Sequence, residues 1–429
     1  MSHANKVYKI RNGKKTKQFT WRVKYKAPEG HDPEWLSESG FPTKKIAEAW
    51  GDEQERQIEA GTWIEPDKRN CTFGEFAEIF MAAKSKRGRT VGTRWDNLEL
   101  HILPRWKSAR LREINWFDVD AWQQTLEVAD IRRRQCVSLM STIMTGAVDA
   151  RYILVNPLFG RRCTRDTAGD AAKPKAPKIR KDGGVRPEDA ILIAERLGPA
   201  VGTHVLATAF SGLRWGEGLG LHRSNALLWR RQAWGAGEFA CQILRVTEEY
   251  AEYNERDKDG TKKGYVIKLE PTKNDGSTRD IDVPQFLARL ILWHMQDWPH
   301  ERLFCTPSGT VWRRGNWSRD FRPACDGRDE REKRRWVPYR EGWEPICEGL
   351  DMRALRALHD TLQAEIGVKK PLEFEAAGHR RPGIKRHYQL PTPAMRAQRL
   401  EGLEEIFWDA MANVGLRALW GRVDLVRHP

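Results

Sequence analysis

A set of basic side chains is spread over the second half of the chain, and a tyrosine follows the last of them. In chain order these side chains are Arg214 with Glu217, Lys273, Arg353 with Arg356, His379 and Tyr388. Guanidinium forks and an ammonium group bind the oxygens of an anion such as a phosphate. Nearby cations also favour the phenolate of a tyrosine, which is otherwise a poor nucleophile because its pKa lies near ~10. Such a set could bind a phosphate and attack its phosphorus.

Taken singly, each of these motifs has an ordinary structural interpretation. Arg214 and Glu217 lie three residues apart and fit a surface ion pair on a helix. Lys273 fits an exposed lysine at the turn of a hairpin over Pro271–Pro284. Tyr388 fits a tyrosine in a basic surface segment. The order and spacing of the motifs therefore carry the functional argument.

That order resembles the catalytic set of the tyrosine recombinases, the family of phage integrases and chromosome-dimer resolvases. The first arginine lies in a GLRxxE motif over Gly212–Glu217, and the lysine precedes an S-x-R stretch at Ser277–Arg279. Arg356 closes the segment that matches HxLR in the family. Tyr388 follows the Gly378-His379 pair by nine positions after the histidine. The resemblance covers essentially the whole chain.

The resemblance implies a role for each residue. Tyr388 would attack the scissile phosphorus and form a 3′-phosphotyrosyl link. Arg214 and Arg356 would bind the non-bridging oxygens, where negative charge builds in the transition state. Lys273 would be the general acid for the 5′-oxygen, and His379 would hydrogen-bond the phosphate or assist proton transfer.

Glu217 would orient the neighbouring cations, and no metal, nucleotide or other cofactor is required. One position departs from the family, since Arg353 stands where it usually has His or Lys. Arginine still donates hydrogen bonds to a phosphate, but it does not act as a base near neutral pH. Arg353 is therefore either a phosphate ligand or a structural residue, with His359 an unrelated histidine at the edge of the core. The 59 residues from Arg214 to Lys273 indicate an insertion.

The composition is that of a basic protein with several folded domains. With 429 residues, 40% of them hydrophobic, the chain has enough apolar mass for several cores. The net charge of +15 favours a polyanionic partner, either nucleic acid or an acidic membrane surface. No apolar run reaches ~18 residues and no signal peptide is recognisable, so we expect a cytoplasmic location. Seven cysteines without a CxxC motif favour reduced thiols over disulfides or a zinc site.

The pattern along the chain predicts a multidomain α+β protein. Residues 1–66 combine strands over Val7–Ile10, Phe19–Lys26 and Trp35–Phe41 with a helix capped by Thr43, which is a small sheet-plus-helix domain. Its basic face is either solvated or, as the resemblance implies, an arm-type DNA-binding surface. The candidate DNA contacts on this face are Lys14, Lys15, Lys17, Arg22 and Lys24.

Residues 70–165 predict an all-helical bundle, which the resemblance identifies as a core-binding domain. A capping box at Thr72 and Glu75 opens its first helix, and a helix over Thr93–Ile102 should end at Pro104. Residues 166–185 form a basic linker without core residues, which suits a polyanion clasped by both flanking domains. The candidate DNA contacts in this linker are Lys173, Lys175, Lys178, Arg180 and Lys181.

Residues 186–429 predict a mainly helical catalytic domain with β-hairpins and a C-terminal tail, the tyrosine recombinase fold. Charged residues over Cys325–Arg335 predict a surface loop. An amphipathic stripe within Pro391–Asp424 packs either on its own domain or, as the resemblance implies, on a neighbouring protomer.

The resemblance implies a site-specific recombinase, an integrase of a phage or mobile element. Its partners would be double-stranded DNA attachment sites, further copies in a tetramer on DNA, a host DNA-bending protein and a directionality factor, and no membrane. One alternative is a cleavage-deficient DNA-binding regulator on the same fold, which Arg353 favours. The other is a type IB topoisomerase-like relaxase, against which the N-terminal domain argues.

Overall fold

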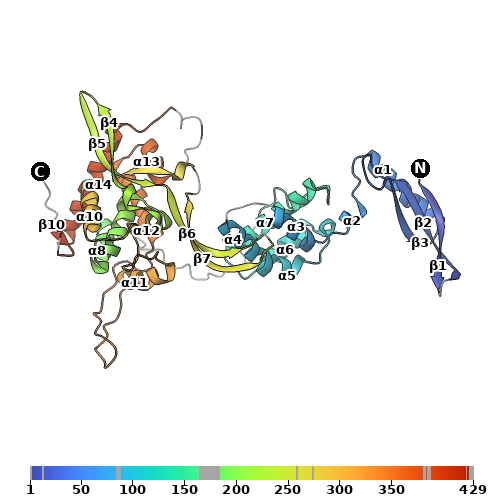
Figure 1. The fold of residues 1–429 in the computed structure, drawn as a ribbon, viewed down its shortest axis with the longest axis horizontal. Helices are drawn as coiled ribbons and strands as arrows, with labels where there is room; N and C mark the ends of the chain where they lie inside the picture. The colour runs from blue at the N-terminus through green and yellow to red at the C-terminus, as the bar shows by residue number, and fades with distance from the viewer. Residues whose placement is uncertain are drawn as a thin grey trace. The chain divides into compact units, whose positions relative to one another are not determined.

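The computed structural model separates into two compact units. Unit 1 comprises Met1–Gly169 with Glu255–Gly264, and unit 2 comprises Asp170–Asn254 with Tyr265–Pro429 (Figure 1). The side chains of residues 10, 11, 14, 15, 275, 423 and 424 are outside the description. The described residues are 2–11, 14–83, 88–163, 184–257, 259–272, 275–379, 383, 388–421 and 423–424.

Unit 1 begins with a three-stranded antiparallel sheet in the order β1-β2-β3. Val23 and Tyr25 point into its core, whereas Arg22 and Lys24 between them are exposed, so the predicted alternation is confirmed here. The Thr43 hydroxyl accepts from the amide of Ile46 and caps the helix that packs on the sheet. The elements are β1 (His3–Arg11), β2 (Lys14–Lys26), β3 (Trp35–Phe41) and α1 (Lys44–Glu59).

A helical bundle follows within unit 1, and its capping box forms as predicted. The carboxylate of Glu75 accepts from the Thr72 amide at 2.8 Å, and the Glu75 amide donates to the Thr72 hydroxyl at 3.3 Å. The bundle comprises α2 (Pro66–Arg69), α3 (Phe73–Ala83), α4 (Gly88–Asn97), a π-helical segment (Leu98–Ile102), α5 (Leu103–Trp106), α6 (Trp116–Thr125) and α7 (Asp130–Asp149).

Pro104 does not end a helix, so that prediction is wrong. The π-helical segment Leu98–Ile102 runs on directly into α5, and Pro104 lies in the first turn of α5. A proline is tolerated there because the first amide groups of a helix have no intrahelical acceptor. The continuous helix buries Leu98, Ile102 and Trp106 in the core of the bundle.

The segment Glu255–Gly264, from the second half of the sequence, packs in unit 1. The buried side chain of Arg256 forms ion pairs with Asp96 at 2.6 Å and with Glu99 at 2.7 Å. Gly260 has a positive φ of 90°, and a Cβ there would lie 3.0 Å from the Trp95 ring. Strands β6 (Glu248–Arg256) and β7 (Lys262–Pro271) form a long hairpin. The buried cation of Arg256 therefore fixes the tip of this hairpin on the bundle.

Unit 2 is built around α8 (Pro187–Ser211). Gly198 has a φ of 75° and kinks this helix. Among the described residues, α8 is the one helix long and apolar enough to span a membrane. Its apolar side chains lie in the core of unit 2, which accounts for that composition. The other helices are α9 (Trp215–Gly220), α10 (Gln285–Gln296), α11 (Arg314–Asp326), α12 (Met352–Ile366), α13 (Lys370–Ala377) and α14 (Pro393–Asn413).

The strands of unit 2 pair differently from the prediction. The hairpin expected over Pro271–Pro284 is wrong, because β8 pairs with β5 and β7 pairs with β6. Pairing with β5 brings Ile281 opposite Leu244, and both side chains are buried in the core. The strands are β4 (Ala226–Trp234), β5 (Gly237–Val246), β6 (Glu248–Arg256), β7 (Lys262–Pro271), β8 (Arg279–Asp282), β9 (Ala418–Leu419) and β10 (Val423–Asp424).

The amphipathic stripe of α14 packs on its own unit. Leu403, Phe407 and Met411 are buried in the same core as α8. The Phe407 ring stacks on Phe286 with 3.6 Å between ring centroids and meets Phe210 edge-on.

We expect Phe407→Ala to lower the free energy of unfolding of unit 2 by about 3–5 kcal/mol, because it leaves a cavity between two aromatic rings. Urea unfolding followed by tryptophan fluorescence and circular dichroism measures the change. Phe117→Ala is the control, since that side chain is 81% exposed and its loss should shift the transition little. Equal shifts in both variants would contradict the assigned core.

Candidate functional site

The site of unit 2 begins where α8 ends. Gly212 caps α8 in the left-handed region with a φ of 68°, and Arg214 is the N-cap residue of α9. The Arg214 amide donates to Oε2 of Glu217 at 2.9 Å, and its Nη1 donates to Oε1 at 2.6 Å. The side chain of Arg214 is thereby fixed at the start of α9.

Glu217 is the buried anion of the site. Its side chain is 1% exposed, and Arg279 on β8 donates to both of its oxygens, at 3.0 and 2.9 Å. Burial by itself raises the pKa of this carboxyl, but the hydrogen bonds and charge of Arg279, together with Arg214, lower it to about 2. Glu217 is therefore ionised, and it orients two arginines from different elements.

Arg356 on α12 brings a further guanidinium to the same place. Its Nη1 donates to the carbonyl of Gly212 and lies 3.9 Å from Oε2 of Glu217. Its Nη2 donates to the carbonyl of Ala377, which also accepts from Nη2 of Arg214 at 3.3 Å. Burial, followed by the charge of Arg214, lowers the pKa of Arg356 to about 10. The two predicted phosphate ligands thus meet at one carbonyl oxygen.

His379 lies beside these arginines at the end of α13. Its amide donates to the Phe374 carbonyl at 2.9 Å, and the preceding Gly378 has a φ of 63°. A Cβ at Gly378 would lie 2.8 Å from Nη1 of Arg279, so the Gly-His pair needs the glycine for conformation and for space. Burial, then the charges of Arg356 and Arg214, lower the pKa of His379, so its neutral form is favoured.

The charges at this site favour an anion as ligand. Three guanidinium groups, those of Arg214, Arg279 and Arg356, lie around the buried carboxylate of Glu217. Like charges at close range are stabilised by an anion that accepts from several of them. Arrangements of this kind bind a phosphate or another tetrahedral oxyanion. Within the described part of the chain, no group of three His, Cys, Asp or Glu side chains is placed to hold a metal.

A second layer of buried polar residues supports the site. His359 is fully buried, and a Cβ at Gly212 would lie 2.5 Å from its ring, so its interpretation as an unrelated core-edge residue is wrong. Arg399 on α14, also fully buried, donates to the Asp282 carbonyl at 3.0 Å and lies 3.3 Å from Nε2 of His359. Arg396 binds the Asp282 carboxylate at 2.5 Å.

Sequence reasoning missed this second layer and the role of Arg279. Arg279 was visible only as the last residue of an S-x-R stretch, and its partner lies 62 residues away in the chain. A strand residue that is both charged and inward-facing was the available signal.

The remaining predicted site residues are exposed or lie outside the described residues. Tyr388 is 78% exposed, and Arg353 is exposed on α12, one turn from Arg356. On the N-terminal sheet, Lys17, Arg22 and Lys24 are exposed. The described residues or side chains do not include Lys273, Lys14, Lys15, Lys173, Lys175, Lys178, Arg180 and Lys181.

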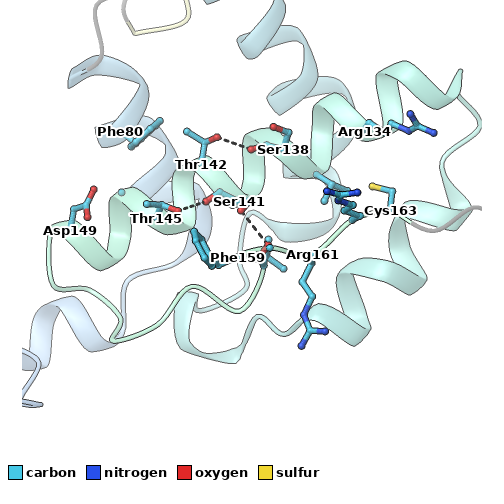
Figure 2. Close-up of a pocket in the computed structure, with 15 residues that line it drawn as sticks. Phe80, Arg134, Ser138, Ser141, Thr142, Thr145, Asp149, Phe159, Arg161 and Cys163 are labelled. Carbon is cyan, nitrogen blue, oxygen red and sulfur yellow. Dashed lines mark hydrogen bonds between the residues drawn. The ribbon is translucent and has the colours of Figure 1, made fainter. Parts of the chain in front are cut away.

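A second feature is a cavity of about 860 Å³ in the helical bundle of unit 1 (Figure 2). One wall is a hydroxyl-bearing face of α7, and the other is the segment from Leu158 to Cys163. The hydroxyls of Thr142 and Thr145 donate to carbonyls of their own helix, at 2.7 and 3.0 Å. Arg134 and Arg161 also line the cavity and are exposed, so its edge is basic.

Comparison with known proteins finds similarity to integrases. No family model matches the chain. A putative prophage phiRv2 integrase of Mycobacterium tuberculosis is 26% identical over 280 residues, 64% of this chain and 66% of that protein, which is just under two thirds of its length. The integrase of Mycobacterium phage D29 is 22% identical over 368 residues, 82% of this chain and 86% of its own.

The fold is also similar to that of a solved integrase. The Tn1549 transposon integrase, solved in complex with transposon right-end DNA, matches with a TM-score of 0.52 and 14% identity, covering 74% of this chain and 98% of that one. The chain is therefore similar in sequence to phage integrases and shares the fold of a transposon integrase. The multidomain α+β fold class inferred from the sequence is confirmed.

We expect Glu217→Gln to lower the free energy of unfolding by about 3 kcal/mol at neutral pH, because it leaves Arg279 buried without its counter-ion. A carboxyl whose pKa is depressed on folding contributes stability above its unfolded value of 4.5, and that contribution is lost as the pH falls towards about 2. The difference between wild type and variant should therefore shrink over that pH window.

Urea unfolding across a pH series checks this expectation. Glu238→Gln is the control, since Glu238 forms an exposed pair with Arg231 and should contribute less than ~1 kcal/mol. A Glu217→Gln difference that stays constant from neutral pH to pH 2 would contradict the role of the ionised carboxylate.

Proposed function

We propose that this protein is a site-specific DNA recombinase that cuts and rejoins DNA through a 3′-phosphotyrosyl intermediate, and so integrates and excises a phage or mobile element. The observation that supports it most is the convergence of Arg214 and Arg356 on the Ala377 carbonyl beside the ionised Glu217. Two fixed guanidinium forks at one point match the two non-bridging oxygens of a phosphodiester.

The reaction is a transesterification in which no phosphodiester energy is lost. The Tyr388 oxygen attacks phosphorus, the P–O5′ bond breaks, and the 3′-phosphate stays on the tyrosine. The leaving 5′-oxygen takes a proton from a general acid, for which the sequence prediction is Lys273. A 5′-hydroxyl from a second duplex then reverses the attack and joins new strands.

The arginines act on the charge that develops during the attack. Each donates to a non-bridging oxygen, and both are held in place before the substrate binds, so little reorganisation is needed. His379, with its pKa lowered by burial and by the two arginines, serves as a neutral hydrogen-bond partner of the phosphate.

The proposal requires the phenol of Tyr388 to come to this site. Tyr388 follows His379 by nine positions, and nine extended residues span up to ~30 Å, which is long enough for that approach. Its exposed side chain leaves the oxygen accessible to a phosphate. The segment that carries it lies between two anchored elements, α13 and α14.

DNA binding outside the catalytic site is assigned to unit 1. The exposed Lys17, Arg22 and Lys24 of the N-terminal sheet are proposed to bind arm sites. The basic edge of the bundle cavity at Arg134 and Arg161 is proposed to contact phosphates of the core site. The basic linker of residues 166–185 would add further contacts.

The proposed assembly is a tetramer on two DNA attachment sites, with a host DNA-bending protein and a directionality factor as further partners. The Tn1549 integrase in complex with transposon end DNA supports a duplex as the substrate. The competing function is a DNA-binding regulator without cleavage, favoured by Arg353 at a position where the family usually has His or Lys.

Wild type should form a covalent adduct with a nicked suicide substrate that carries the element's own attachment core, and Tyr388→Phe should not. The adduct appears as a slower band on a denaturing gel. Tyr265→Phe removes another exposed phenol and should leave the band unchanged. Binding without any adduct in wild type would favour the regulator.

Arg214→Ala and Arg356→Ala should each slow adduct formation by ~100-fold or more, since one donor to a developing oxyanion contributes ~3 kcal/mol. Arg231→Ala removes an exposed arginine of β4 and should have little effect. Single-turnover rates on the same substrate measure this. Rates within a few-fold of wild type in both site variants would contradict the assigned phosphate ligands.

A further inference from the structure

An arginine-rich hairpin projects from unit 2 between α11 and α12 (Figure 1). Residues 328–343, here called the 328–343 hairpin, are paired at three antiparallel bridges. These bridges are Arg328–Trp343, Arg331–Arg340 and Arg334–Val337, each with hydrogen bonds in both directions. The sequence predicted a surface loop over Cys325–Arg335, and the structure shows a paired ribbon instead.

The base of the 328–343 hairpin is fixed to the core. Nη1 of Arg196 on α8 donates to the carbonyls of Ala324 at 3.0 Å and Glu344 at 2.8 Å. The amides of Ile346 and Cys347 both donate to the Cys325 carbonyl. The hairpin is therefore held at its root on both strands, and its tip is presented to solvent in a defined direction.

Its arginines are ordered without carboxylate partners. Every bridge contains at least one arginine, and the guanidiniums of Arg328, Arg331 and Arg340 donate to main-chain carbonyls across the ribbon. The hairpin holds six Arg or Lys and four Asp or Glu. Among the ion pairs of the described residues, none joins these cations to an acid. The exposed cations of the ribbon, Arg331 and the three at its tip, are accessible to an external anion.

The tip adds three successive cations and an aromatic ring. Lys333, Arg334 and Arg335 are all exposed, and the Trp336 side chain is 85% exposed. Tyr339 on the returning strand is 56% exposed. A large exposed indole at the end of a basic ribbon is costly in water unless a partner covers it.

We propose that the 328–343 hairpin is a DNA-binding element of unit 2 that holds phosphates of duplex DNA outside the core site. The proposal rests on the proposed recombinase function for the presence of DNA at unit 2. A two-stranded ribbon has the width of a DNA groove, and bridges three residues apart repeat its arginines about every 10 Å along the backbone. Trp336 provides an apolar surface against sugars or bases.

The test measures DNA affinity of the full chain as a function of salt. Lys333→Gln, Arg334→Gln and Arg335→Gln are combined in one tip variant, and the probe is a long duplex that contains the element's attachment core. The logarithm of the binding constant falls linearly with the logarithm of the salt concentration, and each lost phosphate contact makes that line less steep by about 0.9. For the tip variant we expect weaker binding and a salt dependence that is less steep by about 2 to 3.

Asp329→Asn with Glu332→Gln forms the matched variant on the same hairpin. It removes two exposed acids and should tighten binding to the same duplex. Opposite shifts in the two variants support the proposal, because a general loss of folding would not produce them. Unchanged affinity and slope in both variants would overturn it.

Two further outcomes separate this proposal from its alternatives. If the tip variant binds a single duplex normally but no longer assembles paired duplexes, the hairpin contacts protein and the proposal is wrong. The suicide substrate reports on the proposed function independently. If wild type forms an adduct but the tip variant binds DNA unchanged, only the proposal of DNA binding by the hairpin is refuted. If DNA binding shifts in the tip variant but wild type forms no adduct, only the proposed recombinase function is refuted.

Discussion

The arginine site of unit 2 depends on one buried carboxylate. Glu217 binds Arg279 from β8 and Arg214 from its own helix, and it lies near Arg356 from α12. A buried carboxylate is costly to desolvate, and only well-placed hydrogen bonds and opposite charges offset that cost. The contacts that keep Glu217 ionised therefore also fix the positions of the Arg214 and Arg279 guanidiniums.

A second buried network ties the end of the chain to this site. Arg396 and Arg399, both on α14, bind Asp282 of β8, and Arg399 reaches His359 under Gly212. Helix α14 is thus part of the support of the arginine site. Tyr388, the proposed nucleophile, lies in the chain between α13 and this anchored helix. That arrangement suits a residue that must approach a phosphate and leave it again.

Charge is distributed unevenly between interior and surface. Inside unit 2, acids and arginines are matched through Glu217, Asp282 and Glu375. At the surface, the N-terminal sheet exposes Lys17, Arg22 and Lys24, and the 328–343 hairpin exposes Lys333, Arg334 and Arg335. Exposed charge provides the long-range attraction to a polyanion, and the net charge of the chain is +15.

The sequence by itself determined the local features of this protein. The capping box at Thr72, the N-cap at Thr43 and the helix carrying Arg356 follow from residue types within a few positions, because local hydrogen bonds and periodicity decide them. The motif spacing also identified Arg214, Arg356 and His379, which the fold brings together. Lys273 lies outside the described residues, and its role stays a sequence prediction.

Only the tertiary structure decided the long-range pairings. Strand β8 joins β5 instead of β7, which places Arg279 against Glu217, and residues 255–264 pack on the helical bundle of unit 1. Short strands with similar apolar content have several possible partners, and the choice depends on which pairing buries Ile281 and Leu244 together. No local pattern encodes that choice, because the free energy that settles it comes from contacts across the whole core.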